Sequence, residues 1–370
     1  MNSTKVTRMN HLSAVARLSL FALVGLACTR PCLAGQGRET ARPRVWVLAT
    51  GGTIAAKGTS PTDLTNYRSG TLLGEELIRA VPEIKNYADV KVEQVLNVAS
   101  YDLTLDNWKT IAGRVNQIVV DDPTVAGIVV THGTSTLEET AYFLNLTVKH
   151  DRPVVVVGSM RPPTAISADG PLNLLNAIRT AASPAARGKG VLVVMNDEIN
   201  AARDVTKTST LRVETFRSPD LGLLGYVDED KVAFYRATTK RHTVNSEFDL
   251  RSIQQLPNVE IVYSSQASGT TAITALIESG VRGIVFAGSG PGSLSSDYQA
   301  TLRSVPLARR PVLVRSSRVG SGRVIARREF EPLGMIAGDN LNPQKARILL
   351  MLALTKTTDI SEIQRMFDEY

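Results

Sequence analysis

Cysteine is almost missing from this 370-residue chain. Its two cysteines, Cys28 and Cys32, both precede residue 35. From residue 35 onward the sequence therefore excludes a disulfide framework and a cysteine-based metal site. Histidine is scarce as well, with four residues in the whole chain. Chemistry that needs a base can therefore draw on few imidazoles.

Several functional signatures are also missing. No G-x-G-x-x-G or G-x-x-x-x-G-K-[ST] motif occurs, which excludes a Rossmann fingerprint and a phosphate-binding P-loop. The longest uncharged apolar run, residues 18–27, is too short for a membrane span, which needs about 20 residues. No strongly basic run with interleaved aromatics is present, so nucleic-acid binding is not expected.

The first 34 residues have the pattern of a secretory signal peptide. Three basic residues precede the apolar run 18–27, and small residues follow it up to Ala34, where we expect cleavage. A lipid anchor at Cys28 is the less favoured alternative, because Gly25 stands where a large aliphatic residue is usual. Removing this segment lowers the count of basic residues from 42 to 38 against 35 acidic ones, a net charge of +3. The protein is therefore expected to be periplasmic or secreted.

The remaining 336 residues exceed the size of one hydrophobic core, which predicts two domains. Short runs of β-branched residues without alternation recur, as is typical of strands buried on both faces of a parallel sheet. Helical patterns lie between them, so the fold class is α/β. We expect an N-terminal domain over 42–238, a polar linker over 239–257 and a C-terminal α/β domain over 258–370. The predicted strands are residues 45–49, 127–130, 154–158, 190–195, 261–264, 283–287 and 311–314.

Two of these strands end in threonines beside glycines. The first ends in TGGT at 50–53 and the second in THGTST at 131–136. In an open parallel sheet, ligands bind beyond the carboxyl ends of the strands, and glycines let the backbone approach a ligand closely. Thr53 and Thr134 are therefore the candidate reactive hydroxyls. The competing interpretation is a pair of tight turns whose hydroxyls are satisfied locally.

A threonine hydroxyl is a poor nucleophile until a base removes its proton. Lys207, in a run of small hydroxylated residues, could act as that base if burial keeps it neutral; on local sequence alone it would be a solvated surface charge. A lone histidine such as His132 is more often a packed structural residue than a catalyst, and we keep that interpretation for it.

Thr136 and Glu139 have the spacing of a capping box, which predicts a helix start there. A second helix is predicted to begin at Asn342-Pro343 and to continue through Leu354.

Taken together, these segments resemble the bacterial type II L-asparaginases and the related glutaminase-asparaginases. The resemblance runs over nearly the whole mature chain, and its motifs form an ordered set. It includes VWVLATGGTIA at 45–55, THGT at 131–134, LEETAYF at 137–143, GSMRP at 158–162, SADGP at 167–171, VTK at 205–207, RSSR at 315–318 and LNPQKAR at 341–347.

The resemblance implies a larger N-terminal domain with a mostly parallel, flavodoxin-like sheet covered by helices on both faces. It implies hydrolysis of a side-chain amide to an acid and ammonia through an acyl-enzyme, with no metal or organic cofactor. By this resemblance Thr53 is the nucleophile, and its partner is Tyr67 in the polar and mobile loop 57–70. Thr134 and Lys207 form the second catalytic pair. It also implies a homotetramer of tight dimers. The substrate-binding residues that it implies are Gly52, Ser100, Tyr101, Gly133 and Ser135.

This sequence departs from the family pattern where the substrate's α-ammonium binds. Ser135 replaces the aspartate of HGTDT, Tyr101 replaces a glutamine or glutamate, and Pro291 replaces an asparagine. Around Arg327 and Arg328 the resemblance is loose, and an arginine stands where the family has a further acidic residue that contacts the ammonium. Three functions therefore stay open: hydrolysis of L-asparagine or L-glutamine, hydrolysis of amides with an uncharged or substituted α-nitrogen, and amino-acid binding without turnover.

Overall fold

The computed structural model describes residues 41–370, in which the compact unit runs from Arg42 to Tyr370. The predicted signal peptide, residues 1–34, lies outside the described residues. Among the helices that are described, none is both long and apolar enough to cross a membrane.

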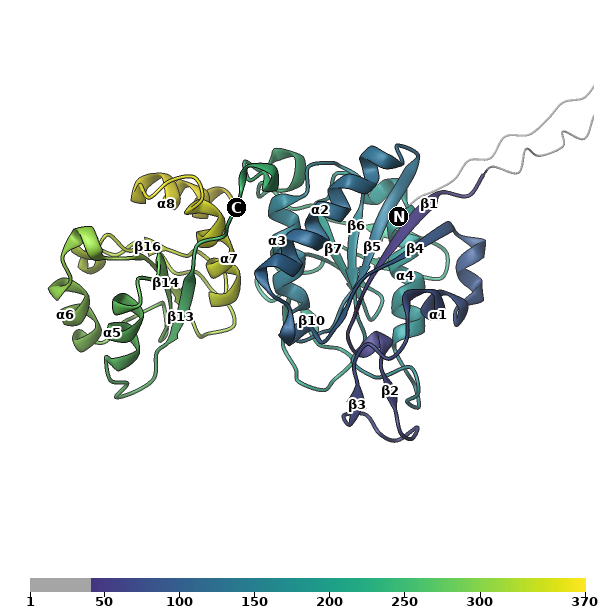
Figure 1. Cartoon of the computed structure of the whole chain (residues 1–370), viewed down its shortest axis with the longest axis horizontal. Helices are drawn as coiled ribbons and strands as arrows, with labels where there is room; N and C mark the ends of the chain where they lie inside the picture. The colour runs from purple at the N-terminus through teal and green to yellow at the C-terminus, as the bar shows by residue number, and fades with distance from the viewer. Residues whose placement is uncertain (1–40) are drawn as a thin grey trace, which may run out of the picture. The chain divides into compact units, whose positions relative to one another are not determined.

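An eight-stranded sheet forms the first half of this unit (Figure 1). Its strand order is β12-β11-β8-β7-β6-β5-β1-β4, and the five strands from β7 to β4 are parallel neighbours. In chain order these five run 2-1-3-4-5, which is the flavodoxin-like arrangement. The parallel strands are β1 (Arg44–Gly51), β4 (Asp89–Val98), β5 (Val125–Thr131), β6 (Val154–Val157) and β7 (Val191–Met195); the antiparallel edge is β8 (Glu198–Ala201), β11 (Gly225–Val227) and β12 (Val232–Phe234).

Helices cover both faces of this sheet because its central strands are apolar on both sides. All four valines of β6 are buried. In β1, Leu48 joins one core cluster while Val45 and Val47 join another, since successive side chains point to opposite faces. Within this half, the first cluster contains residues of α2 (Leu105–Asp121) and α3 (Leu137–Thr147), and the second contains residues of α1 (Gly74–Arg79) and α4 (Gly170–Ala182). The first cluster also extends into the C-terminal helices α7 (Pro343–Ala353) and α8 (Ile360–Glu369).

A smaller, four-stranded parallel sheet forms the second half, in the order β13-β14-β15-β16. Helix α7 is almost wholly buried and lies against it, with Asn342 as its N-cap accepting from the Lys345 amide. The elements are β13 (Val259–Tyr263), β14 (Gly283–Gly288), β15 (Val312–Ser317), β16 (Ile336–Ala337), α5 (Thr271–Glu278), α6 (Ser296–Ser304), α7 (Pro343–Ala353) and α8 (Ile360–Glu369).

Short elements fill the connections. The segment that we propose as the linker, 239–257, contains two 3₁₀ turns, η5 and η6. The 3₁₀ turns are η1 (Thr53–Ala55), η2 (Pro82–Asn86), η3 (Ser100–Asp102), η4 (Pro184–Ala186), η5 (Thr243–Asn245), η6 (Leu250–Ser252), η7 (Leu307–Arg309) and η8 (Arg328–Leu333); the remaining strands are β2 (Lys57–Gly58), β3 (Tyr67–Arg68), β9 (Thr206–Lys207) and β10 (Phe216–Arg217).

The α/β class and all seven predicted strands are confirmed within two residues at each end, except that β15 continues three residues further, to Ser317. The helix after Asn342-Pro343 is confirmed too, with Leu354 as its C-cap. The capping box at Thr136 is wrong. Thr136 is the N-cap of α3, but its hydroxyl makes no capping bond and instead donates to the Ser100 carbonyl at 2.8 Å.

Candidate active site

The two threonine loops follow neighbouring parallel strands. Ala49 near the end of β1 pairs with Thr131 at the end of β5, so Gly52-Thr53 and Gly133-Thr134 leave the sheet side by side. This place is the topological switch point of the flavodoxin-like order, because the connections after β1 and β5 lead away in opposite directions. Ligands bind at such points in open α/β sheets.

Glycine is what lets the two loops touch. A Cβ added to Gly52 would lie 2.3 Å from the Cα of Gly133, and Gly52 has a φ of +83°. A Cβ added to Gly133 would lie 2.8 Å from the hydroxyl oxygen of Ser100. A side chain at Gly52 would therefore drive the loops apart, and one at Gly133 would displace the Ser100 side chain.

Tyr67 reaches the first threonine from a small hairpin. The loop 57–70 contains β2 and β3, which pair antiparallel, and Tyr67 stands in β3. The hydroxyls of Thr53 and Tyr67 lie 2.8 Å apart, with either one able to donate. Backbone bonds from Gly70 to the Gly52 carbonyl (3.4 Å) and from Leu72 to the Ala55 carbonyl (2.8 Å) tie the end of the loop to η1.

Lys207 reaches the second threonine from β9. Its Nζ donates to the Thr134 hydroxyl at 2.9 Å across 73 residues of sequence. Burial lowers the pKa of Lys207 below the ordinary lysine value, and the negative charge of Glu138 partly opposes that shift. A lysine with this surrounding is closer to losing its proton at neutral pH than a solvated one.

Eight of the nine residues expected at the site line one open cavity. Lys207 is the exception, since it reaches the cavity only through its bond to Thr134. Thr65 and Ser69, from the hairpin loop on either side of Tyr67, also line the cavity, and no sequence pattern singles them out. The lining residues are Gly52, Thr53, Thr65, Tyr67, Ser69, Ser100, Tyr101, Gly133, Thr134 and Ser135.

The positions that depart from the family pattern fall into two groups. Ser135 and Tyr101 line the cavity, and Tyr101 is 71% exposed. Pro291, Arg327 and Arg328 belong to the C-terminal half and are not among the residues that line it. The altered side chains that this chain brings to its own cavity are therefore a hydroxyl and an aromatic ring.

His132 is not among the residues that line the cavity. It is fully buried, and its Nδ1 lies 2.7 Å from the Gly133 carbonyl, to which only a protonated nitrogen can donate. Burial lowers the pKa of His132 to about 4, so the ring is neutral at pH 7. This agrees with the structural interpretation of His132, which holds the backbone of the second loop.

Charged ligands for a metal do not gather in the described part of the chain. Over residues 41–370, no group of three or more histidine, cysteine, aspartate or glutamate side chains could hold a metal ion. The cavity offers hydroxyls, backbone groups and one nearby amine, which is a set suited to nucleophilic attack on a carbonyl group.

Comparison with known proteins identifies this arrangement. Residues 44–240 match the family "Asparaginase, N-terminal", and residues 258–367 match the "Glutaminase/Asparaginase C-terminal domain". The chain is 49% identical to L-asparaginase 2 of Bacillus subtilis, over 89% of this chain and 87% of that protein. It is 45% identical to a protein named "Probable L-asparaginase periplasmic" from Haemophilus influenzae, over 89% of this chain and 93% of the other.

A solved structure agrees. The crystal structure of a probable cytoplasmic L-asparaginase from Campylobacter jejuni has a TM-score of 0.86 to this chain at 46% sequence identity. It covers 89% of this chain and the whole of that one. The chain therefore belongs to the glutaminase/asparaginase family and is an amidohydrolase of the L-asparaginase type.

Proposed function

We propose that this protein hydrolyses the side-chain amide of L-asparagine, with L-glutamine as the alternative substrate, through an acyl-enzyme on Thr53. The observation that carries the proposal is a pair of hydrogen bonds made by the two threonines that line one cavity. Thr53 is 2.8 Å from the Tyr67 hydroxyl, and Thr134 is 2.9 Å from the Lys207 amine. A binding protein would need neither a nucleophile nor a base.

In the first half of the reaction, the Thr53 oxygen attacks the amide carbon and its proton passes toward the Tyr67 oxygen. As the carbon–nitrogen bond breaks, the Tyr67 hydroxyl passes its own proton on to the leaving nitrogen, which departs as ammonia. In the second half, a water molecule attacks the ester carbon, which releases the acid and returns the proton to Thr53. We assign to Thr134 and Lys207 the handling of the water and of the proton that moves with it.

Substrate binding follows from the remaining lining residues. We propose that Ser100 holds the α-carboxylate of the substrate, and that the backbone at Gly52 and Gly133 lies along the reacting amide. The contact between the two glycines supports this, because it leaves no side chain between the backbone and a ligand. Ser135 and Tyr101 then face the α-nitrogen.

Ammonia release from a panel of amides tests the proposal. The panel contains L-asparagine, L-glutamine, their N-acetyl forms and asparagine within a short peptide. Wild-type protein should release ammonia from at least one of them, and Thr53→Ala should not. Protein that binds an amino acid but releases no ammonia from any amide would instead be a binding protein on this fold.

A second candidate function is hydrolysis of amides whose α-nitrogen is uncharged or substituted. Ser135 and Tyr101 favour it, because a hydroxyl and an exposed ring line the cavity where a carboxylate would pair with an ammonium. A charge-assisted hydrogen bond is worth about 1.5–3 kcal/mol, or roughly tenfold and more in binding.

We therefore expect Ser135→Asp to raise kcat/KM for L-asparagine about tenfold or more and to lower it for the N-acetyl form. Steady-state kinetics on both substrates provide the measurement, with Thr136→Ser as the neighbouring control. The second candidate fails if wild-type protein already prefers free L-asparagine and Ser135→Asp abolishes that activity.

Export and assembly are also part of the proposal. The family relative from Haemophilus influenzae is named periplasmic, whereas the solved relative from Campylobacter jejuni is named cytoplasmic. For this chain we propose export with cleavage after Ala34, and a homotetramer. Secreted or periplasmic protein should begin at Gly35 by mass spectrometry and sediment at four chain masses. An exported protein that still begins at Met1, or a monomer at micromolar concentration, would contradict these expectations.

A further inference from the structure

Glu138 is a buried carboxylate one helical turn beyond Thr134. It stands in the first turn of α3 and is 6% exposed. A carboxylate in such a place costs free energy unless its oxygens are paired. Both of its oxygens are indeed paired, and their partners come from elements far away in the sequence.

One oxygen holds the strand that carries Lys207. Oε1 of Glu138 accepts from the Thr206 hydroxyl at 3.0 Å and from the backbone N–H of Lys207 at 3.2 Å. Strand β9 has two residues, and its one partner strand is the equally short β10. Glu138 therefore supplies a large share of the bonds that fix where β9 lies relative to Thr134.

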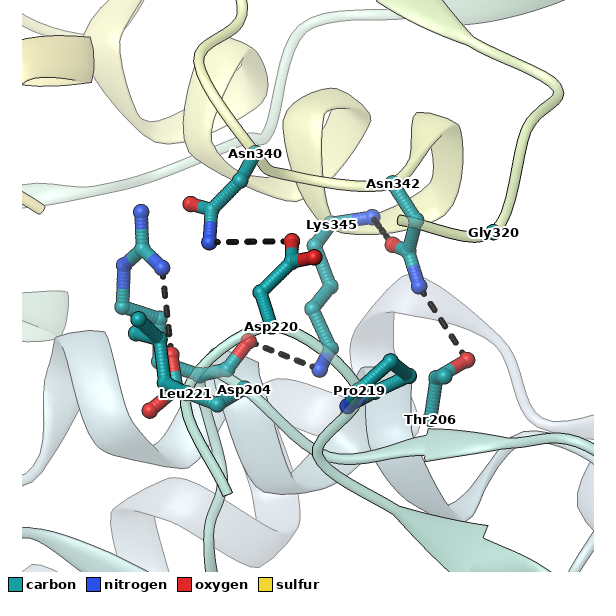
Figure 2. Close-up of a pocket in the computed structure, with 10 residues that line it drawn as sticks. Asp204, Thr206, Pro219, Asp220, Leu221, Gly320, Asn340, Asn342 and Lys345 are labelled. Atoms are coloured by element: carbon teal, nitrogen blue, oxygen red, sulfur yellow. Dashed lines mark hydrogen bonds and ion pairs between the residues drawn. The ribbon is translucent and has the colours of Figure 1, made fainter. Parts of the chain in front are cut away.

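The other oxygen faces helix α7 of the C-terminal half. Oε2 accepts from the Asn342 side-chain amide at 2.9 Å, and the Lys345 amine lies 3.8 Å away. Lys345 is 2% exposed and also donates to the carbonyls of Arg203 and Val205, which lead into β9. Figure 2 shows Asn342 reaching Thr206 and the Lys345 amine directed at the same segment.

We propose that Glu138 is a positioning residue that holds Lys207 against Thr134, and that α7 secures Glu138 through Asn342. This inference rests on the proposed function, because it takes Lys207 to be the base of the second pair. Glu138 itself is not among the residues that line the cavity.

The charges around Glu138 and Lys207 decide in which direction the pKa of Lys207 should change when Glu138 is replaced. Burial lowers the pKa of Lys207, and Glu138 is the one charged group that raises it. Around Glu138 stand Lys345, whose pKa burial lowers to about 8, and Glu139, whose pKa burial and Glu138 raise to about 7. Arg203 and Asp204 lie beyond Lys345 and act on it with opposite signs. Removing the Glu138 charge should therefore lower the pKa of Lys207.

Two variants separate charge from reach. Glu138→Gln keeps the shape but loses the charge, so the acidic limb of kcat/KM, where Lys207 deprotonates, should move to lower pH while kcat falls about tenfold or more. Glu138→Asp keeps the charge but is one methylene shorter. It should lower kcat and leave the limb much nearer to its wild-type position. Glu139→Gln is the matched control, since it makes the same change at the next residue without a bond to β9.

The role of α7 is tested at Asn342. Asn342→Ser keeps an N-cap for the helix but removes the amide that reaches Glu138, so kcat should fall by about fivefold with KM little changed. Asp220→Asn is its control. Asp220 accepts from the Gly322 N–H and from the Asn340 side-chain amide (Figure 2), and neither of these bonds involves Glu138.

A second readout does not depend on turnover. Competitive labelling of amines with acetic anhydride across a pH series, read by peptide mass spectrometry, reports the protonation of Lys207 directly. In Glu138→Gln, Lys207 should become reactive at lower pH than in wild type. Thermal unfolding of each variant shows whether it is folded, and if Glu138→Gln does not fold, Glu138→Asp tests the positioning role, because an unchanged kcat in that variant would overturn it.

The outcomes are distinct. If no variant and no wild-type sample hydrolyses any amide, the proposed function fails, and the labelling still decides the effect of Glu138 on Lys207. If wild type is active and Glu138→Gln leaves both the acidic limb and the labelling profile unchanged, the inference about Glu138 is overturned. An Asn342→Ser variant as active as Asp220→Asn overturns the part assigned to α7.

Discussion

Thr53→Ala is expected to lower kcat/KM for amide hydrolysis by at least about 10³-fold and to leave the fold intact. The side chain of Thr53 makes its one hydrogen bond to Tyr67, and the turn η1 that carries it is held by backbone bonds. Removing the hydroxyl therefore removes the attacking atom with little loss of packing. Ammonia release under saturating and limiting substrate measures the effect.

Thr53→Ser is the control for this prediction. It keeps an attacking hydroxyl and loses one methyl group, so it should retain a measurable fraction of wild-type activity. If Thr53→Ala keeps more than a tenth of wild-type kcat/KM while Thr134→Ala loses all of it, the nucleophile is Thr134 and the assignment of the two threonines is reversed.

Lys207→Met is expected to lower kcat by about 10²–10⁴-fold, the usual contribution of a positioned acid or base. Burial lowers the pKa of Lys207, and a base must be unprotonated to act. Activity should therefore rise with pH through the Lys207 pKa in wild type, and this limb should vanish in the variant. A pH profile of kcat/KM provides the measurement.

Lys207→Arg separates two roles of the amine. Arginine can still donate to the Thr134 hydroxyl, but it stays protonated at every accessible pH. It should therefore be nearly as inactive as Lys207→Met if the lysine acts as a base. An active arginine variant would mean that the lysine serves only as a hydrogen-bond donor.

The fold could be predicted from sequence where its strands are apolar on both faces. The valine run 154–157 predicts a strand that is buried on both faces of a parallel sheet, and all four residues are indeed buried. Strand β4 was not predicted, since exposed and partly buried residues alternate along it at the edge of the sheet. The antiparallel strands β8, β11 and β12 were missed as well, because each has only three or four residues.

Local sequence likewise predicts some residues of the site and not others. Thr53 and Thr134 could be found from local sequence, because strand ends and glycines mark where ligands bind in such sheets. Lys207 could be paired with Thr134 only through the family resemblance, since 73 residues separate them. Glu138 was not predicted at all. Its partners stand 68, 69 and 204 residues away, and no local pattern reports contacts of that kind.

The most direct test of the account is to identify the residue that carries the acyl group during turnover. Wild-type protein mixed rapidly with its best amide substrate and quenched in acid should yield a peptide spanning Thr53 that is heavier by the acyl group. The same peptide from Thr53→Ala should be unmodified. An acyl group on Thr134, or release of ammonia with no acylated peptide at any quench time, would contradict the central claim.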